Sequence, residues 1–385
     1  MNNKVTITVP GIIFACCIFS VLFPFLVKAQ EVPQQYREDW SVSWPNREAQ
    51  HLEIKAYVDK LLDEDIQKSL NMFKPDFSSI EKYKSSLTPY RKVMGDFYGY
   101  PPPKSKEGKI TKFIKVGEDV NCTVYRIWVE VIDGVNAYGI YMVPKNLKGK
   151  APLIIAQHGG GGNPEAICDL GTRENYHSFG QEAVKRGYIV WAPALAMNSS
   201  YAKDPDIPGA NRELLDKKLQ FAGTSIIGIE LQKIIESAKT LAKERPEIDA
   251  SRIGMTGLSW GGFFTMYSTA LCPFIKVAVP ASYFLDTEVG LKKAVADNSK
   301  VPPERLIFSG IGHFQAIGLI CPRPCMVQLG ANDGLFNMDE AKKEAERSAV
   351  FYKKLGIGDK FEFNVHKGGH EFEIDAIFKF FGKYL

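Results

Sequence analysis

The stretch that decides the fold is GMTGLSWGGFF, residues 254–264, in which Ser259 stands among glycines. It follows an apolar, strand-like run and precedes a second apolar run. Gly257 and Gly261 complete the pattern G-x-S-x-G, which suits a sharp turn from a strand into a helix. Side chains two residues either side of the serine would collide with the strained turn or with the neighbouring helix. The pattern predicts that Ser259 is a nucleophile, and the rest of the chain must then supply a base, an acid and an oxyanion site.

Strands and helices alternate on both sides of this turn. Apolar, strand-like runs and amphipathic runs follow one another from residue 151 to the end of the chain. Such alternation predicts an α/β fold with a mostly parallel, doubly wound sheet. Two further strands precede it, joined at Asp133-Gly134, and predict an antiparallel N-terminal hairpin. The expected strands are 120–131, 135–143, 151–157, 188–194, 252–257, 275–280, 325–330 and 360–366, and the expected helices are 178–187, 226–243, 261–271, 340–355 and 373–384.

The first 29 residues resemble an export signal. Lys4 precedes an almost uncharged stretch from residue 5 to 27, and small or aliphatic residues at Val27 and Ala29 predict cleavage after Ala29. The same stretch is long enough to span a bilayer, so an uncleaved membrane anchor is the alternative. In either case we expect the catalytic part to be exported, to the periplasm or the medium.

The remainder divides into a helical N-terminal extension, residues 30–115, and a catalytic domain, residues 116–385. We expect the extension to pack against the sheet and to contribute to the rim of the pocket. A lid and a dimerisation arm are the alternatives. Two irregular insertions, near 194–224 and 283–320, follow strand ends, where binding loops gather in such sheets. The sequence does not indicate which oligomeric state the protein adopts.

The composition excludes several function classes. The chain has 385 residues and a net charge of +4, with no clustered Lys/Arg stripe, so we expect no nucleic-acid partner. The lysines of 104–115 alternate with polar and apolar residues, as on a solvated surface. Seven cysteines fall to five without Cys16 and Cys17, an odd number with irregular spacing that excludes a disulfide framework. Cys321 and Cys325 could form a local bridge, a metal half-site or two buried thiols, and no other spacing supports a metal.

A base and an acid follow Ser259 in the chain. His370 lies after two glycines, in the loop between the last strand and the last helix, and is the candidate base. Asp333 directly follows the strand CMVQLG and is the candidate acid that would orient the imidazole. Asp286 is the rival acid, whereas His366 at a strand end is expected to be structural. The order Ser, Asp, His is the order expected of this fold.

The fourth part is a glycine-rich loop, QHGGGGN, residues 157–163, which follows a buried strand. Its exposed backbone N–H groups predict an oxyanion site, with donors from Trp260 and from Gly159 or Gly160. His158 is expected to orient this loop rather than to act as a base. The loop lacks the ending of a P-loop and the spacing of a dinucleotide site.

With these parts assembled, the chain resembles the dienelactone-hydrolase-like branch of the α/β-hydrolases, in particular exported acetylxylan and carbohydrate esterases. The resemblance covers about residues 125–385 and rests on QHGGGGNPEA, NYHSFGQEAVKRGYIVWAPA, RIGMTGLSWGG, LICPRPCMVQLGANDG and YKKLGIGDKFEFNVHKGGHEF. It implies an α/β-hydrolase fold with Ser259 as nucleophile, Asp333 as acid and His370 as base. Dienelactone hydrolase itself uses a cysteine nucleophile, so the serine here points to ordinary esters.

The sequence therefore predicts an exported serine ester hydrolase that works through an acyl-enzyme and needs no cofactor or metal. The resemblance implies deacetylation of a carbohydrate or a similar small ester. A single-domain serine peptidase of the same fold is the nearest alternative, because it would share the triad. An inactive binding protein is the alternative from another class.

Overall fold

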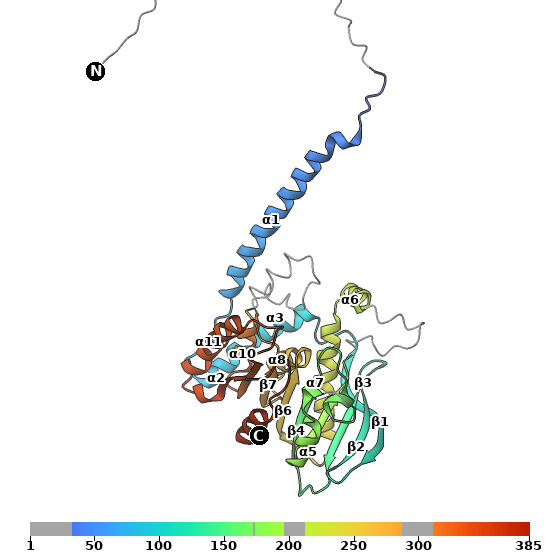
Figure 1. Ribbon diagram of the computed structural model, residues 1–385, viewed down its shortest axis with the longest axis vertical. Helices are drawn as coiled ribbons and strands as arrows, with labels where there is room; N and C mark the ends of the chain where they lie inside the picture. The colour runs from blue at the N-terminus through green and yellow to red at the C-terminus, as the bar shows by residue number, and fades with distance from the viewer. Residues whose placement is uncertain (1–32, 172–173, 196–211, 287–310) are drawn as a thin grey trace, which may run out of the picture. The chain divides into compact units, whose positions relative to one another are not determined.

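The computed structural model describes residues 33–171, 174–195, 212–286 and 311–385 (Figure 1). The chain divides into two compact units, residues 1–58 and 59–385. In the first unit, Asp39 caps a short 3-10 turn, η1 (Trp40–Ser43), by accepting a hydrogen bond from the Ser41 N–H, and helix α1 (Trp44–Leu70) begins. The predicted export signal lies outside the described residues.

The second unit contains one nine-stranded sheet with helices on both faces. Its strands are β1 (Ser105–Glu118), β2 (Cys122–Ile132), β3 (Val135–Pro144), β4 (Ala151–Gln157), β5 (Ile189–Pro193), β6 (Ile248–Leu258), β7 (Val277–Ala281), β8 (Cys325–Gly330) and β9 (Phe361–His366). Its helices are α2 (Ile80–Ser86), α3 (Thr88–Tyr98), α4 (Pro164–Ile167), α5 (Phe179–Lys185), α6 (Arg212–Phe221), α7 (Ile226–Glu244), α8 (Trp260–Leu271), α10 (His313–Ile320), α11 (Met338–Lys354) and α12 (Ile374–Tyr384). Short 3-10 turns η2 (Glu174–Tyr176) and η5 (Gly358–Lys360) complete the described elements.

The strand order is β1-β2-β3-β5-β4-β6-β7-β8-β9. The first three strands and β5 pair antiparallel, and β5, β4, β6, β7, β8 and β9 pair parallel. Figure 1 shows β1–β3 on one side of this unit and α10 and α11 on the other. This confirms the predicted fold class, a mostly parallel α/β sheet preceded by an antiparallel hairpin. The parallel strands all end at one edge of the sheet, where their loops can meet.

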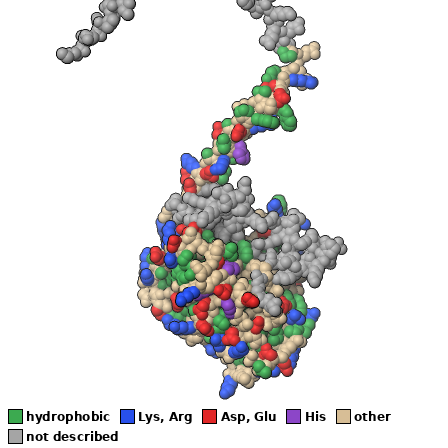
Figure 2. Space-filling view, in the orientation of Figure 1, with side chains coloured by type: hydrophobic (Ala, Val, Ile, Leu, Met, Phe, Trp, Pro, Cys, Tyr) green, Lys and Arg blue, Asp and Glu red, His purple; other side chains and the backbone are tan. Residues whose placement is uncertain are grey.

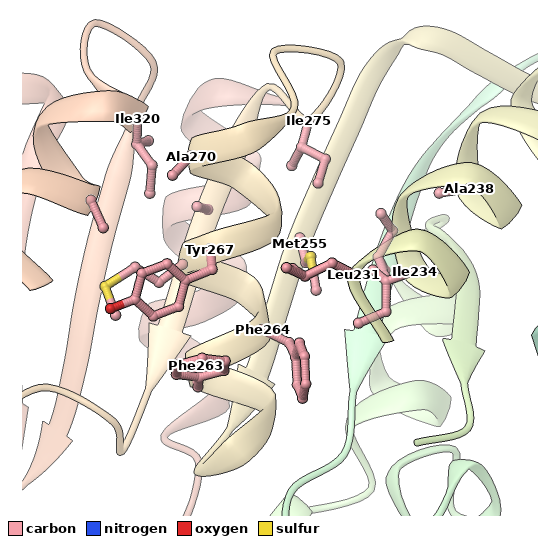
Figure 3. Packing of buried hydrophobic residues seen from close by; sticks show 14 of the residues in the cluster. Leu231, Ile234, Ala238, Met255, Phe263, Phe264, Tyr267, Ala270, Ile275 and Ile320 are labelled. Carbon is pink, nitrogen blue, oxygen red and sulfur yellow. The ribbon is translucent and has the colours of Figure 1, made fainter. Parts of the chain in front are cut away.

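Each face of the sheet is covered by its own hydrophobic cluster. The larger cluster gathers apolar side chains of α3, α7, α8, α10 and α11, and the smaller one those of α4, α5 and α12. Helix α8 is buried along most of its length. Figure 3 shows Phe264 on the side of the helix that faces Met255 of β6 and Leu231 of α7, and Tyr267 on the other side, toward Ile320 of α10. The helix that begins after Ser259 is therefore held rigidly on both sides.

Strand β1 begins inside residues 30–115, which the sequence indicated as a helical extension, and continues into the predicted catalytic domain. Residues 105–118 pair with β2 along most of their length and form an edge of the sheet. Their side chains are mostly exposed, and lysines recur at positions 106, 109, 112 and 115. Lysines on an exposed edge strand discourage pairing with other chains. The same lysines interrupt the apolar pattern by which the other strands were predicted, so this strand was not predicted. The prediction that these lysines are solvated agrees with this exposure.

Arg323 of the CPRPC segment forms a buried, hydrogen-bonded crosslink between helix ends. Arg323 donates hydrogen bonds to five backbone carbonyls, at distances of 2.6–3.2 Å, on Thr269, Leu319, Ile320, Cys272 and Ile275. These carbonyls lie at the carboxyl ends of α8 and α10 and in the loop after α8. Burial lowers the pKa of Arg323 to about 10, so the side chain keeps its charge at neutral pH.

The cysteines, the predicted insertions and the helices also bear on the sequence predictions. Cys321 and Cys325 are free and buried, as are the other cysteines in the described part of the chain. The two predicted insertions include α6 and α10, but residues 196–211 and 287–310 lie outside the description. Among the helices that can be described, none is both long and apolar enough to cross a membrane. On the face seen in Figure 2, acidic and basic side chains are interspersed.

Candidate active site

Ser259 lies in the one-residue turn between β6 and α8. Its backbone has φ 60° and ψ −122°, a conformation that non-glycine residues rarely adopt. The Ser259 N–H donates to the Ala281 carbonyl at 2.9 Å, which ties the turn to the end of β7. A serine held at positive φ between a strand and a helix is the geometry of a nucleophile elbow, in which the hydroxyl is presented above the sheet edge.

The glycines beside Ser259 answer a packing constraint. A Cβ atom on Gly261 would overlap the Gln157 carbonyl oxygen at the end of β4, and one on Gly257 would overlap the Gly261 carbonyl. The turn is therefore so close to β4 that only hydrogen atoms fit at these two positions. The G-x-S-x-G spacing is a property of this contact between β4, β6 and α8.

His370 and Asp333 form a hydrogen-bonded pair. Asp333 follows β8, His370 follows β9, and the distance from His370 Nδ1 to Asp333 Oδ2 is 2.8 Å. The Leu335 N–H donates to Asp333 Oδ1 at 3.1 Å, which fixes the carboxyl group. When Nδ1–H donates to a carboxylate, the neutral imidazole has its lone pair on Nε2, where a base is needed.

The environment keeps Asp333 ionised. Its side chain is 1% exposed. Burial raises the pKa of Asp333, but the hydrogen bonds from His370 and the Leu335 N–H outweigh that effect, and the pKa lies below its ordinary value. The group beside His370 is therefore a carboxylate at neutral pH, which would stabilise an imidazolium.

The rival acid, Asp286, lies in a different buried cluster. Its Oδ2 atom is 3.4 Å from Lys343 Nζ on α11. Nearby, the Leu285 N–H donates to His313 Nδ1 at 3.3 Å, and the Phe314 N–H donates to Glu344 Oε1 at 3.0 Å. The structure thus brings Asp333, and not Asp286, to His370.

This second cluster makes stability depend on pH. Burial raises the pKa of Glu344 to about 7, against the opposing effects of Arg347 and the Phe314 N–H. The folded state then binds a proton that the unfolded state releases, so this contribution is complete below pH 4.5 and is lost as the pH rises through 7. Between pH 8 and pH 5 we expect the wild-type free energy of unfolding to rise by roughly 2–3 kcal/mol relative to that of Glu344→Gln.

Urea denaturation at both pH values measures this difference. Burial also lowers the pKa of His313 to about 4, but His313 is present in both proteins and its contribution cancels. Glu346→Gln, an exposed position on the same helix, is the matched control and should follow the wild type. Parallel pH profiles for wild type and Glu344→Gln would contradict the prediction.

The glycine-rich loop lies directly against the nucleophile. A Cβ on Gly159 would be 3.0 Å from the Cβ of Ser259, and one on Gly160 would be 2.9 Å from Cδ1 of Trp260. The Gly159 N–H donates to the Tyr176 hydroxyl at 2.9 Å. Of the two glycines that the sequence left open, Gly160 is therefore the better candidate donor.

His158 holds this loop from behind. It is buried, its Nε2 accepts the Leu195 N–H at 3.0 Å, and its Nδ1 is 3.0 Å from the Gly159 carbonyl. With Nε2 as acceptor, Nδ1 carries the proton and donates to that carbonyl. One ring nitrogen thus contacts the loop and the other contacts the chain after β5, and the orienting role of His158 stays a prediction.

Sequence reasoning missed an aromatic wall that joins Trp260 to His370. Tyr283 lies 5.7 Å from Trp260 and 5.7 Å from Phe336 between ring centroids, and Phe336 stacks on the His370 ring at 6.2 Å and 16°. Tyr176 lies in NYHSFGQEAVKRGYIVWAPA, one of the stretches that carry the resemblance, but neither it nor Tyr283 was given a role from the sequence. In the described ranges, no group of three or more His, Cys, Asp or Glu side chains could hold a metal ion.

Comparisons with known proteins identify a family model and a relative that are hydrolases. The family model described as acetyl xylan esterase (AXE1) matches residues 111–300, which include Ser259 and the glycine-rich loop but not Asp333 or His370. A Bacillus subtilis (strain 168) protein named "Putative hydrolase YtaP" is 26% identical over 237 residues, 60% of this chain and 76% of the relative.

Solved structures of esterases share the fold. One is a "putative acetyl xylan esterase" from Bacteroides fragilis NCTC 9343, with a TM-score of 0.60 and 18% identity, covering 77% of this chain and 80% of the other. Another is a carbohydrate esterase family 15 glucuronoyl esterase from Caldicellulosiruptor kristjansonii, with a TM-score of 0.54 and 17% identity, covering 79% and 85%. The narrower likeness to dienelactone hydrolases stays a prediction.

Proposed function

Because residues 111–300 match the family model of acetyl xylan esterase (AXE1) and the chain is a carboxylic ester hydrolase, we propose that it is an exported serine esterase that deacetylates a carbohydrate. The observation that supports this most is the His370–Asp333 hydrogen bond of 2.8 Å, formed at the same sheet edge as the strained turn of Ser259. A serine hydroxyl is a poor nucleophile at neutral pH and needs such a base.

The proposed mechanism has two steps. Ser259 Oγ attacks the ester carbonyl, and His370 Nε2 takes the hydroxyl proton. The oxyanion is stabilised by the N–H groups of Trp260 and Gly160. As the tetrahedral intermediate collapses, His370 gives the proton to the leaving sugar oxygen, and an acetyl-serine remains.

In the second step, His370 takes a proton from water, and the hydroxide formed attacks the acetyl carbonyl. Collapse returns the proton to Ser259 Oγ and releases acetic acid, which ionises to acetate. Asp333 stays ionised throughout and stabilises the imidazolium. The mechanism uses only these side chains and backbone N–H groups and requires no cofactor.

The carbohydrate substrate is the finer part of the proposal. The name of the matching family supports an acetylated xylan, and several neighbours with the same fold are described as carbohydrate esterases. Export rests on the sequence of residues 1–29. On expression of the whole chain in a bacterium, we expect the protein outside the cytoplasm with Gln30 at its N-terminus. A chain retained with residue 1 intact would contradict cleavage.

The test combines turnover with covalent labelling. We expect the protein to hydrolyse p-nitrophenyl acetate, to release acetate from acetylated xylo-oligosaccharides, and to be inactivated by phenylmethylsulfonyl fluoride with the adduct on Ser259. An adduct on a different serine would overturn the nucleophile. Hydrolysis of p-nitrophenyl acetate without acetate release from any acetylated sugar would overturn the substrate. Cleavage of peptide p-nitroanilides in preference to esters would favour the peptidase.

A further inference from the structure

A small cavity lies between the glycine-rich loop, strand β3 and the residues that follow β5. It has a volume of about 200 Å³. Tyr138 of β3, His158, Glu165 and Leu195 contribute to its lining, together with Asn163 and Pro164. Drug-sized ligands occupy pockets of about 300–1,000 Å³. This cavity is therefore suited to a single small ring.

The sheet register fixes where the cavity lies relative to the nucleophile. The Ala194 N–H donates to the Tyr138 carbonyl at 2.8 Å, which places Tyr138 at the same edge as the carboxyl ends of the parallel strands. From β3 to β6 the order is β3-β5-β4-β6, three strand spacings or about 14 Å. This is the offset of Tyr138 from β6, whereas His158, which also lines the cavity, follows β4 beside β6. An acetyl group on Ser259 cannot reach the Tyr138 ring, so an occupant that packs on Tyr138 would be part of the alcohol side of the ester.

Tyr138 is held in place on its hydroxyl and on its ring. Its hydroxyl donates to Glu165 Oε1 at 3.0 Å and accepts from Arg126 Nε at 3.0 Å. Trp128, its partner in the register of β2 and β3, packs on the ring with centroids 5.0 Å apart. Burial and the nearby Glu165 raise the pKa of Tyr138, so the phenol stays neutral. The ring is thus a fixed wall, with little ordering entropy left to lose on binding.

The charges around the cavity balance. Arg126 lies 3.7 Å from Glu165, so the cation and the carboxylate of the network face each other. The lining then combines apolar surfaces of Tyr138, Pro164 and Leu195 with the oxygens of Glu165 and Asn163. This combination fits a neutral ring that has an apolar face and a rim of hydroxyl groups, and it does not favour a carboxylate or a phosphate.

We propose that this cavity is a subsite for one neutral pyranose ring of the glycan, at a distance from the sugar that bears the acetyl group. The inference rests on the proposed function for the identity of the glycan, but the subsite itself requires only binding. Tyr138 is its main positioning wall, and Glu165 accepts hydrogen bonds from ring hydroxyls.

The experiment separates binding from catalysis. Binding of xylotriose, cellotriose and mannotriose to the full chain is measured by calorimetry, beside kcat/KM for p-nitrophenyl acetate and for acetylated xylotriose. Tyr138→Ala should weaken trisaccharide binding about 10-fold or more, and should lower kcat/KM for acetylated xylotriose by a similar factor through KM. Its kcat/KM for p-nitrophenyl acetate should stay within about 2-fold, because that substrate does not reach the cavity.

Tyr125→Ala is the matched control, since Tyr125 is a half-buried tyrosine on β2 that packs on Phe113. It tests whether loss of a ring from the hairpin is enough to change binding, and it should leave all three measurements unchanged. Loss of p-nitrophenyl acetate turnover in Tyr138→Ala equal to the loss for the sugar ester would overturn the subsite. Absence of trisaccharide binding by the wild type would overturn it too, whereas Tyr138-dependent binding without deacetylation would overturn only the proposed function.

Discussion

Asp333→Asn should lower kcat for p-nitrophenyl acetate about 10⁴-fold without unfolding the protein. The substituted amide can still bond to His370, but it presents either an N–H donor or a neutral oxygen to Nδ1. The tautomer with its lone pair on Nε2 is then no longer enforced, and the imidazolium loses its anionic partner. Asp333 accepts from His370 at 2.8 Å and from the Leu335 N–H at 3.1 Å. It is the only anion of the pair, so the substitution removes the negative charge beside the imidazole.

Asp286→Asn is the matched control for this prediction. Asp286 is also a buried carboxyl that follows a strand, but it faces Lys343 and not His370. We expect its variant to retain most of the wild-type kcat, while Ser259→Ala gives the lower limit of the assay. Near-normal activity in Asp333→Asn together with a large loss in Asp286→Asn would reverse the assignment of the acid. Circular dichroism of each variant shows whether its fold is retained.

Arg323→Met should lower the free energy of unfolding by about 2–6 kcal/mol, because it removes the donors of five buried carbonyls. Three of these carbonyls keep another partner: Leu319 is bonded by Arg91, Ile320 by the Arg323 N–H, and Cys272 by the Ile275 N–H. The main cost therefore falls on Thr269 and Ile275. An unmade hydrogen bond at a buried carbonyl costs about 1–3 kcal/mol.

Chemical denaturation measures this loss, and Arg323→Lys provides a second variant if Arg323→Met does not fold. Lysine keeps the charge but has three donors on one nitrogen, so its loss should be intermediate. Arg252→Met is the matched control, since Arg252 is 40% exposed and its bonds to Asp249 lie at the surface. Its effect should stay within about 1 kcal/mol. An Arg323→Met protein as stable as the Arg252→Met protein would contradict the proposed crosslink.

Most of the sheet could be predicted because its strands are apolar and separated by helices of clear period. The expected hairpin and all six of the later strands are present, with ends that differ by a few residues. Strand β1 was not predicted because an exposed edge strand has no continuous apolar face, and its lysines are typical of a solvated loop. Helix α6 and helix α10 lie in stretches that interrupt the alternation, so the regular spacing used elsewhere gave no indication of them.

The candidate site could be predicted as far as each residue type belongs to a local pattern. The sequence placed Asp333 and Asp286 alike, each after a strand, and only the fold brings Asp333 to His370. It likewise left Gly159 and Gly160 open, because the hydroxyl of Tyr176 that takes the Gly159 N–H comes from a segment 17 residues away. Contacts of this kind depend on how loops meet above the sheet, which no local pattern encodes. The catalytic roles stay predictions.

Helix α8 connects the catalytic turn to the buried crosslink through its own electric field. Its 12 residues span about 18 Å, from Trp260 beside the nucleophile to the carbonyls that bind Arg323. The peptide dipoles give the first end a partial positive charge and the last end a partial negative one. A guanidinium held at the last end compensates the negative pole and stabilises the helix there. The turn that carries the candidate nucleophile and the carbonyls that bind Arg323 are thus the two ends of one helix, and a change at Arg323 loosens the end far from Ser259.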